Sequence, residues 1–403
     1  MVENVSDPEV GQSAKLNFDN TEIAFKGKSP AEMERAYWLF KIISSNFLTK
    51  IGPSITNTAL KIGLPIVPLI KSTIFSQFCG GETIGECEHT INQLAEGHVG
   101  TILDYSVEGE EDERVFIETA DEIIKTIKRA KGDKKVPLTV FKITGVGRFG
   151  ILEKLDSEGE LNNSEQVEWI KLKGRVSMIC QAAYESDVPV MIDAEESWIQ
   201  KTIDQLAVDM MRRYNRDRAI VLNTYQLYRH DKLQSLKDDI QFAISNGFIL
   251  GAKIVRGAYM EKERKRAAEI GYPSPIQPDK EATDRDYNLA VQACMENLEH
   301  VAFVAGTHNE NSCKLLAELA DKLSVRHNHP NIFFSQLLGM SDNLSFNLSH
   351  AGYNVAKYVP YGPVKAVLPY LFRRAQENTS IAGQTSRELG LIIKEKKRRS
   401  GRS

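Results

Sequence analysis

The sequence predicts a (β/α)8 barrel of the α/β class, with an all-helical extension on its N-terminal side. Eight short apolar runs recur between residues 99 and 358, and longer amphipathic stretches separate them. Mostly apolar strands that alternate with helices are typical of a parallel sheet covered by helices. An open doubly wound sheet needs a Gly-rich phosphate turn after its first strand, whereas Asp104-Tyr105-Ser106-Val107-Glu108 stands there. Eight such units over about 300 residues therefore favour a closed barrel.

The first 95 residues are predicted to form an arm followed by a helical region. Residues 1 to about 25 are polar with little periodicity, which indicates a loosely held arm. A capping serine, a proline at the first helical position and an acid in the first turn mark a helix start at Ser29-Pro30-Ala31-Glu32. Prolines and a glycine pair then divide the chain into short helices. The dividing residues are Pro53, Pro65, Pro68 and Gly80-Gly81.

Residues 96–390 are assigned to the barrel and residues 391–403 to a basic tail. The predicted strands are Val99–Tyr105, Leu138–Ile143, Val188–Ile192, Ala219–Leu222, Ile249–Val255, Ala302–Ala305, Ile332–Ser335 and Asn354–Tyr358. Three of the helical stretches between them are Trp169–Tyr184, Trp198–Tyr214 and Asn288–Leu298. Their apolar residues recur at the helical period, which predicts helices that pack one face on the sheet.

The composition excludes several classes of protein. The 403 residues carry 51 basic and 54 acidic side chains, so the formal net charge of -3 builds no global field for nucleic acid. Five spread cysteines without a CxxC pair predict buried thiols in a reducing compartment. No apolar run reaches about 18 residues, and the acidic start lacks the features of a signal peptide. We therefore expect a cytoplasmic protein without a metal site.

Polar residues stand at every predicted strand end, which is where a barrel of this kind carries its active site. They are Asp104, Lys142, Asp193 with Glu195 and Glu196, Tyr225-Gln226, Lys253 with Arg256-Gly257-Ala258-Tyr259, Thr307-His308-Asn309, Gln336 and Tyr358. Charges that point into a barrel mouth are costly unless something pairs with them. Ion pairing at a structural rim explains any one of them, whereas all eight strand ends together favour a functional site.

Two of these residues have more than one interpretation. Lys142 is either the Schiff-base lysine of an aldolase or a positive charge that holds an anion or a flavin. His308 has no second histidine three or four residues away, so we interpret it as a hydrogen-bonding residue and expect no metal there.

The helix predicted at residues 364–378 carries the sharpest local pattern. Residues 364, 367, 368, 371 and 372 form an apolar stripe. On a different face, Tyr370, Arg373, Arg374 and Glu377 follow one another at helical spacing. Two guanidinium groups beside an aromatic ring can hold a carboxylate while the ring covers an apolar part of the same molecule. The alternative is a solvated helix face with a surface Arg–Glu pair.

Residues from about 97 to 380 resemble the proline dehydrogenase family, flavoproteins that oxidise L-proline to pyrroline-5-carboxylate. Three matches carry the resemblance: Lys253-Ile254-Val255-Arg256-Gly257-Ala258-Tyr259, Tyr358, and Tyr370-Leu371-Phe372-Arg373-Arg374 with Glu377-Asn378. Ile192-Asp193-Ala194-Glu195-Glu196, Gln226, Thr307-His308-Asn309 and Leu337-Leu338-Gly339-Met340 match in order and spacing. The chain looks like the single-function mitochondrial type and is too short for the bifunctional bacterial form. It departs from many bacterial members in having Lys253 where they have arginine.

The resemblance implies that the site binds L-proline and FAD. It places Lys142, Arg373 and Arg374 around the carboxylate of proline, and Tyr259, Leu337, Tyr358 and Tyr370 around its ring. Lys253 and Gln226 would face the isoalloxazine edge, and Asp193 would orient the tyrosine and flavin neighbours. Arg256, Gly257 and Ala258 would lie near the FAD phosphates. The further cofactor candidates are Val255, Thr283, Thr307, His308, Asn309, Gln336, Leu337, Glu377 and Ser380.

Three alternatives stay open at this point. A flavin-free lyase or aldolase would use Lys142 as its nucleophile. A non-catalytic binding barrel would bind the same ligands without turnover. Hydroxyproline dehydrogenase is the nearest enzymatic alternative, and Tyr358 bears on it, because a phenol above the substrate ring leaves little room for a 4-hydroxyl group.

The resemblance further implies hydride transfer to flavin N5 and a quinone-type electron acceptor. A quinone-reducing enzyme must reach a membrane, and the basic tail offers a contact. Lys394, Lys396, Lys397, Arg398, Arg399 and Arg402 follow the apolar stretch Leu389–Ile393, with Glu395 as the single acid. The tail is interpreted either as a peripheral contact with the inner face of a bacterial inner membrane or as a frayed, solvated terminus.

Overall fold

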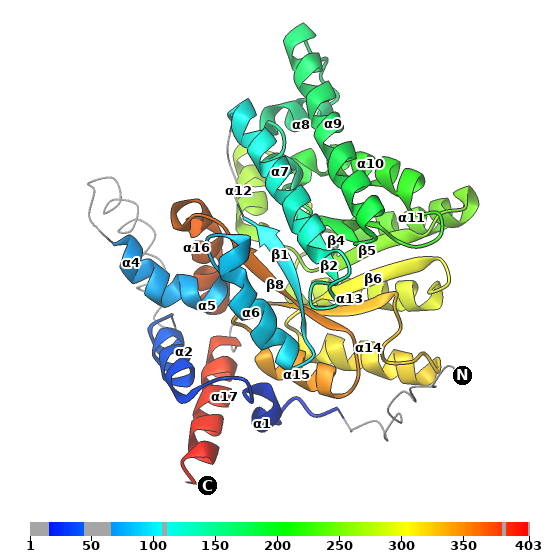
Figure 1. Cartoon of the computed structure of the whole chain (residues 1–403). Coiled ribbons are helices and arrows are strands. Elements are labelled where there is room, and N and C mark those ends of the chain that lie inside the picture. Colours follow the sequence, from blue (N-terminus) through cyan, green and yellow to red (C-terminus); the bar gives the residue numbers. More distant parts are fainter. Residues whose placement is uncertain (1–15, 44–65, 107–110, 381–383, 402–403) are drawn as a thin grey trace, which may run out of the picture.

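The computed structural model describes residues 16–43, 66–106, 111–380 and 384–401. Its centre is a closed barrel of eight parallel strands in chain order, which confirms the predicted (β/α)8 fold (Figure 1). The strands are β1 (Gly100–Tyr105), β2 (Leu138–Phe141), β3 (Val190–Ile192), β4 (Val221–Gln226), β5 (Leu250–Val255), β6 (Val301–Gly306), β7 (Ile332–Leu337) and β8 (Val355–Tyr361). Each overlaps its predicted run, but β4, β6, β7 and β8 extend further toward their carboxyl ends.

The barrel closes between its first and last strands. β1 and β8 pair in parallel from Gly100 opposite Ala356 to Tyr105 opposite Tyr361. Alternate strand residues point inward, and Ile102, Met191 and Leu222 belong to the buried apolar cluster that fills the barrel. Residues that point outward pack on the surrounding helices in a larger cluster. The interior is therefore a packed core, and the mouth is left for chemistry.

Helices follow the strands and cover the barrel. They are α7 (Glu113–Ala130), the 3-10 turn η2 (Ile143–Gly145), α8 (Phe149–Asp156), α9 (Asn163–Ser186), α10 (Ser197–Tyr214), α11 (Lys232–Asn246), α12 (Met260–Ile270), α13 (Lys280–Glu296), α14 (Glu310–Lys322), α15 (Asp342–His350) and α16 (Val364–Ser380). Local sequence fixes several ends: Asn162 and Glu165 form a capping box at the start of α9. Gly247, with a φ of 67°, supplies the left-handed residue that ends α11.

The predicted helical front part is confirmed for residues 16–43 and 66–96, and it packs on one side of the barrel with the C-terminal helices (Figure 1). Pro53 and Pro65, which were predicted to divide it, lie outside the described residues. It contains α1 (Thr21–Ala24), α2 (Pro30–Ile43), α4 (Val67–Ile70), the π-helical segment η1 (Lys71–Phe75), α5 (Ser76–Phe78) and α6 (Ile84–Glu96). Met33, Phe40 and Phe78 share a buried apolar cluster with Leu371 of α16 and with Leu391. This second core attaches the front part to the helix that carries the arginine pair.

The prediction of a loosely held arm is wrong for residues 16–25. Phe18 is 2% exposed, and its backbone oxygen accepts a hydrogen bond of 3.2 Å from the Asn343 side chain. The segment is polar and its apolar residues show little periodicity, so the sequence pattern did not reveal the few apolar residues that anchor it. Residues 1–15 lie outside the described part of the chain.

The basic end of the chain forms a helix, α17 (Gln384–Arg399), which runs across the predicted boundary at residue 390. Arg399 donates hydrogen bonds to the backbone oxygens of Phe25 at 2.6 Å and Lys28 at 2.8 Å, and Lys394 donates to that of Asp19 at 2.7 Å. A frayed terminus is therefore the wrong interpretation for residues 384–401, while the domain division itself stays a prediction. Within the described ranges, no helix is both long and apolar enough to cross a bilayer. All five cysteines are free and buried, as predicted.

Candidate active site

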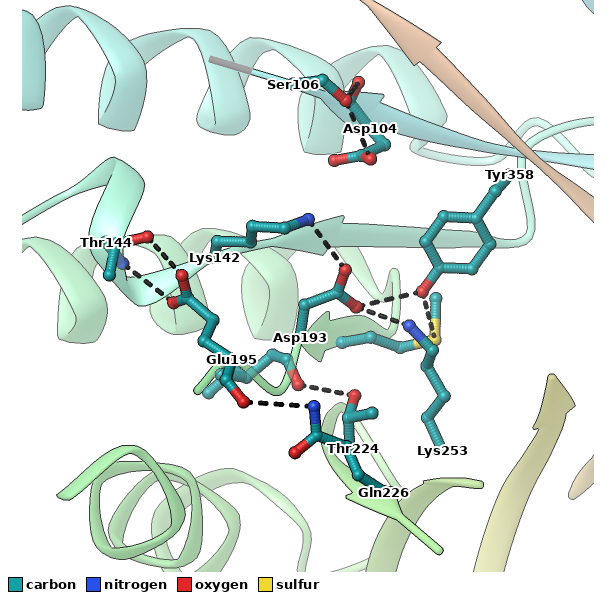
Figure 2. Close-up of polar contacts among 12 residues, drawn as sticks. Asp104, Ser106, Lys142, Thr144, Asp193, Glu195, Thr224, Gln226, Lys253 and Tyr358 are labelled. Carbon is teal, nitrogen blue, oxygen red and sulfur yellow. Dashed lines mark hydrogen bonds and ion pairs between the residues drawn. The ribbon is translucent and has the colours of Figure 1, made fainter. Parts of the chain in front are cut away.

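Polar side chains from β1, β2, β3, β4, β5 and β8 converge at the carboxyl ends of the strands (Figure 2). They come from neighbouring strands of a parallel barrel, which brings residues far apart in sequence to one mouth. The residues are Asp104, Lys142, Asp193, Gln226, Lys253 and Tyr358. The structure thus brings together a large part of the residues that the sequence analysis selected.

Asp193 is the centre of this group. Its carboxylate receives the Lys142 ammonium at 3.0 Å on Oδ2 and the Lys253 ammonium at 2.5 Å on Oδ1 (Figure 2). The hydroxyl of Tyr358 donates to Oδ1 at 3.3 Å. Burial alone would raise the pKa of Asp193, but the opposing effect of the two ammonium groups is larger and lowers the pKa to about 2. Asp193 is therefore ionised at neutral pH and holds both lysines in place.

Lys253 is held from two sides. Besides its contact with Asp193, its ammonium lies 4.4 Å from the centroid of the Tyr358 ring. Burial lowers the pKa of Lys253, and the nearby Lys142 lowers it too, while Asp193 opposes both. Asp104, on β1, accepts a hydrogen bond of 3.0 Å from Ser106. The Tyr358 ring thus lies against one cation, Lys253, and its hydroxyl contacts one carboxylate, Asp193.

Glu195 forms a second buried pair beside this centre. Its carboxylate accepts hydrogen bonds from the backbone N–H of Thr144, at 3.1 Å, and from the Thr144 hydroxyl. Burial raises the pKa of Glu195 to about 7, although these hydrogen bonds oppose the shift. The Gln226 side chain donates to the backbone oxygen of Glu195 at 3.1 Å. Gln226 Oε1 is buried, and no hydrogen bond within the described part reaches it.

Arg256 connects the carboxyl ends of β5 and β6 to two helices. Its guanidinium donates to Asp284 at 2.7 Å, to Thr307 at 2.7 Å and to Ser312 at 2.9 Å. It also lies 4.2 Å from the centroid of the Tyr287 ring. These contacts fix a positive charge beside the first turns of α13 and α14, where backbone N–H groups already favour an anion.

Gly257 follows Arg256 with a φ of 132°, which a residue with a side chain rarely adopts. A Cβ atom at this position would lie 2.5 Å from the Tyr228 ring. Glycine is therefore required here, and both Gly257 and Ala258 are exposed. Val255 is the half-buried last residue of β5, and Tyr259 precedes α12.

Several cofactor candidates are committed to contacts within the protein. The Gln336 amide donates to the backbone oxygen of Thr307 at 3.0 Å and accepts from Ser345 at 2.8 Å. Asn309 caps α14, and Thr283 is buried in the first turn of α13. His308 Nδ1 lies 2.9 Å from the Ser341 hydroxyl. Burial and nearby cations lower the pKa of His308 to about 3, so its imidazole is neutral at physiological pH.

The polar face of α16 is turned toward the protein and not toward solvent. Tyr370 and Arg374 are each 7% exposed, and the Arg374 guanidinium lies 5.1 Å from the Tyr370 ring centroid. Arg373 is half-buried, 5.9 Å from the ring centroid of Tyr259. The alternative of a solvated face is therefore wrong for Tyr370 and Arg374. The side chains of Glu377 and Ser380 lie outside the described part of the structure.

Sequence reasoning missed several partners of these residues. It did not select Thr144, Asp284, Ser312 or Ser341, which hold Glu195, Arg256 and His308. Each lies within a few residues of a strand end or a helix start, which was the available signal. The catalytic and binding roles of the selected residues stay predictions.

Comparison with known proteins points to one family. A family model described as proline dehydrogenase matches residues 87–387. Proline dehydrogenase 1, mitochondrial, from Dictyostelium discoideum is 32% identical over 431 residues, covering 96% of this chain and 75% of the relative. The carbapenem antibiotics biosynthesis protein CarD from Pectobacterium carotovorum subsp. carotovorum is 34% identical over 328 residues, covering 81% and 85%. The human proline dehydrogenase 1, mitochondrial, is 38% identical over 270 residues, covering 66% and 45%.

Solved structures share the fold. The crystal structure of proline utilization A from Bdellovibrio bacteriovorus, inactivated by N-propargylglycine, aligns with a TM-score of 0.72 at 19% identity. The alignment covers 95% of this chain and 42% of that longer chain. At this identity the likeness shows the fold alone.

Proposed function

Because the chain belongs to the proline dehydrogenase family of enzymes, we propose that it oxidises L-proline to 1-pyrroline-5-carboxylate with FAD as cofactor, as a step of proline catabolism. The observation that carries this proposal is the buried group at the barrel mouth, in which Asp193 lies between Lys142 and Lys253. The buried Tyr370 and Arg374 of α16 supply an aromatic ring and a second cationic side.

The residues at the mouth fit FAD. The buried Gln226 Oε1 accepts no hydrogen bond within the described part of the structure, and an N–H group of the isoalloxazine edge would supply the missing donor. Lys253 presents a cation to the same region. Arg256 and the exposed backbone of Gly257 suit the phosphates, because glycine permits close approach and the guanidinium supplies charge. When bound, FAD supplies the electron acceptor for the oxidation, by hydride transfer to its N5 atom.

The chain's own residues would bind and orient proline. Arg373 and Arg374 would hold its carboxylate through charge-assisted hydrogen bonds, with Lys142 as a further cation. Tyr370, Tyr259 and Leu337 would enclose the apolar ring and exclude water. Asp193 would act indirectly, because it fixes Lys142, Lys253 and the Tyr358 hydroxyl in one arrangement.

Anaerobic titration of the purified protein with proline tests this function. We expect the absorbance bands of oxidised flavin to bleach and the effect to saturate with proline. A yellow protein whose bands proline does not change would leave a non-catalytic binding barrel. A colourless protein that does not bind added FAD would favour the Schiff-base lyase instead. The ion pair between Lys142 and Asp193 speaks against that lyase, because it stabilises the ammonium form and a nucleophile must be neutral.

Hydroxyproline is the competing substrate, and Tyr358 provides the test. We predict that Tyr358→Ser lowers kcat/KM for proline and lowers the ratio of kcat/KM for proline to that for hydroxyproline, because it opens space beside the ring. Tyr358→Phe is the matched control, since it keeps the ring and removes only the hydroxyl contacts with Asp193 and Met191. A ratio that stays constant or rises in the serine variant contradicts Tyr358 as the selectivity wall.

We also propose a quinone-type acceptor and a cytoplasmic protein that contacts the inner face of the membrane peripherally. Lys397 at the end of α17 is exposed, whereas Lys394, Lys396 and Arg399 contact the front part of the chain. Three of the cations thus already contact protein groups, although Lys394 and Arg399 stay exposed. We expect sedimentation with anionic vesicles at low salt and release at high salt. Equal sedimentation with neutral vesicles would contradict the electrostatic contact.

A further inference from the structure

The turn between β7 and α15, residues 337–341, has an unusual backbone. Gly339 has a φ of 76°, and a Cβ atom there would lie 2.2 Å from the Gln77 backbone oxygen. Ser341 has a φ of 51° although it is not glycine, and the left-handed region is unfavourable for such a residue. A turn of this kind keeps its shape only where its surroundings hold it.

Lys357 holds this turn from outside the barrel. It precedes Tyr358 in β8, so its side chain points away from the barrel interior, and it is 0% exposed. Its ammonium donates to the backbone oxygen of Met340 at 2.6 Å and to that of Leu337 at 3.3 Å. It also forms an ion pair of 2.8 Å with Asp342. One buried cation thus ties both ends of the turn.

Two further residues complete the network. Glu388 of α17 accepts a hydrogen bond of 2.6 Å from the backbone N–H of Ser341, whose hydroxyl contacts His308. Lys28 of the front part pairs with Asp342 at 2.6 Å. Asp342 is buried between the two lysines. Burial of its carboxylate without these partners would be unfavourable. β8 and α17 therefore contact the turn itself, and Lys28 of the front part contacts Asp342, the residue directly after it.

We propose that Lys357 is a positioning residue, which holds the turn 337–341 so that Leu337 stands against the substrate ring, with Glu388 as the second anchor of the same turn. The inference rests on the proposed function only in that Leu337 borders proline. The chemistry of Lys357 suits this role, because an ammonium has three donors and can satisfy two carbonyls and a carboxylate at once. A buried charge in this place is otherwise costly.

The experiment compares three variants. Lys357→Met removes the donors to the turn. Lys28→Met is the matched control, because it removes a partner of the same Asp342 and no contact with the turn. The third variant combines Lys357→Met with Asp342→Asn. Lys357→Met alone leaves the Asp342 carboxylate with one partner fewer, and Asp342→Asn removes that carboxylate. The double variant therefore separates a loss of stability from a loss of positioning. The probe is cyclopentanecarboxylate, which keeps the ring and carboxylate of proline, and its dissociation constant is read from the flavin absorbance.

We expect Lys357→Met to weaken binding of the probe by about tenfold or more, and to speed amide hydrogen exchange in the turn. The double variant should have a higher melting temperature than Lys357→Met but the same weakened affinity for the probe. In Lys28→Met, the affinity for the probe and the slow amide exchange of the turn should both stay as in the wild type. The proposal is overturned if Lys357→Met binds the probe like the wild type, if the double variant regains affinity, or if Lys28→Met loses as much. Failure of the wild type to bind the probe would contradict the proposed function, while hydrogen exchange would still test the turn.

Discussion

The adjacent arginines of α16 lie in different surroundings, and this difference is testable residue by residue. Arg374 is buried beside Tyr370, whereas Arg373 is half-buried beside Tyr259. If both hold the carboxylate as proposed, changing either to methionine removes a charge-assisted contact worth about 1.5–3 kcal/mol. We therefore predict that KM for proline rises by about tenfold or more in each variant, while FAD stays bound.

Steady-state kinetics and the flavin content of the purified variants measure this. Lys365→Met provides the control, because Lys365 is exposed on the same helix. Unchanged KM values in both arginine variants would remove α16 from the proposed carboxylate site.

Glu195 makes a prediction about stability and pH. Its pKa is raised from 4.5 to about 7 by burial. When the pH is below the ordinary pKa of a glutamate, Glu195 is protonated in both the folded and the unfolded state, and the protein has the full stability of the protonated form. Above that pKa the unfolded chain binds fewer protons, so the free energy of unfolding falls as pH rises toward about 7, by roughly 3 kcal/mol in all.

Glu195→Gln keeps a hydrogen-bonding side chain beside Thr144 and removes this titration. Urea unfolding at about pH 5 and about pH 8 should show a smaller loss of stability in the variant than in the wild type. Glu160→Gln at an exposed position is the control, since it changes the net charge of the protein by the same amount. Equal pH dependence in Glu195→Gln and the wild type would contradict the assignment.

At the scale of elements, the sequence predicted those whose evidence is local. Eight apolar runs were enough for the barrel, because strands covered on both faces are continuous in hydrophobicity. The predicted fourth strand stopped too early, because Asn223 and Thr224 are polar. The Asn223 amide nitrogen donates to Asp204 and the Thr224 hydroxyl donates to the backbone oxygen of Ile192, and sequence spacing does not reveal these partners.

The candidate site shows the same limit. Order and spacing selected Lys142, Asp193 and Lys253, but only the barrel geometry puts both ammonium groups on one carboxylate. Likewise, the sequence left the charges of α17 as either a peripheral membrane contact or a solvated tail. Glu395 is in fact 0% exposed beneath Arg398 and Arg399, because α1 and α2 lie against this helix.

Deleting residues 394–403 tests the role of α17. The deletion removes the hydrogen bonds from Lys394 and Arg399 to the front part and the buried Glu395 with its two arginines. The loss of these contacts loosens the end of α17 from the front part, so we predict a melting temperature lower by roughly 4 °C. Calorimetry measures it, with the exposed Lys397→Ala as control. An unchanged melting temperature would mean that the helix end adds nothing to stability.

For the whole molecule, FAD binding and folding should be coupled. Gln226 lies in β4, whereas Lys253 lies in β5 and Arg256 directly follows it. These residues come together only when the strands pair, so the unfolded chain has no counterpart of the proposed FAD site. With free FAD at about 100 times its dissociation constant, we predict a gain of about 2.7 kcal/mol in the free energy of unfolding. Thermal unfolding of flavin-stripped protein with and without added FAD measures the gain. Riboflavin, which lacks the phosphates, should stabilise the protein less, and an equal effect would contradict the phosphate contacts of Arg256.

The pairing of β1 with β8 has a consequence for biosynthesis. A chain emerging from the ribosome carries its first strand for a long time before residues 355–361 arrive to pair with it. Until then both β1 and β7 expose unpaired edges, which invite pairing with other chains. The arginines that follow β8 in α16 emerge later still. An interrupted translation product therefore contains most of the barrel but lacks the arginine pair of α16. We expect it to be a substrate for chaperones and proteases before it can be an enzyme.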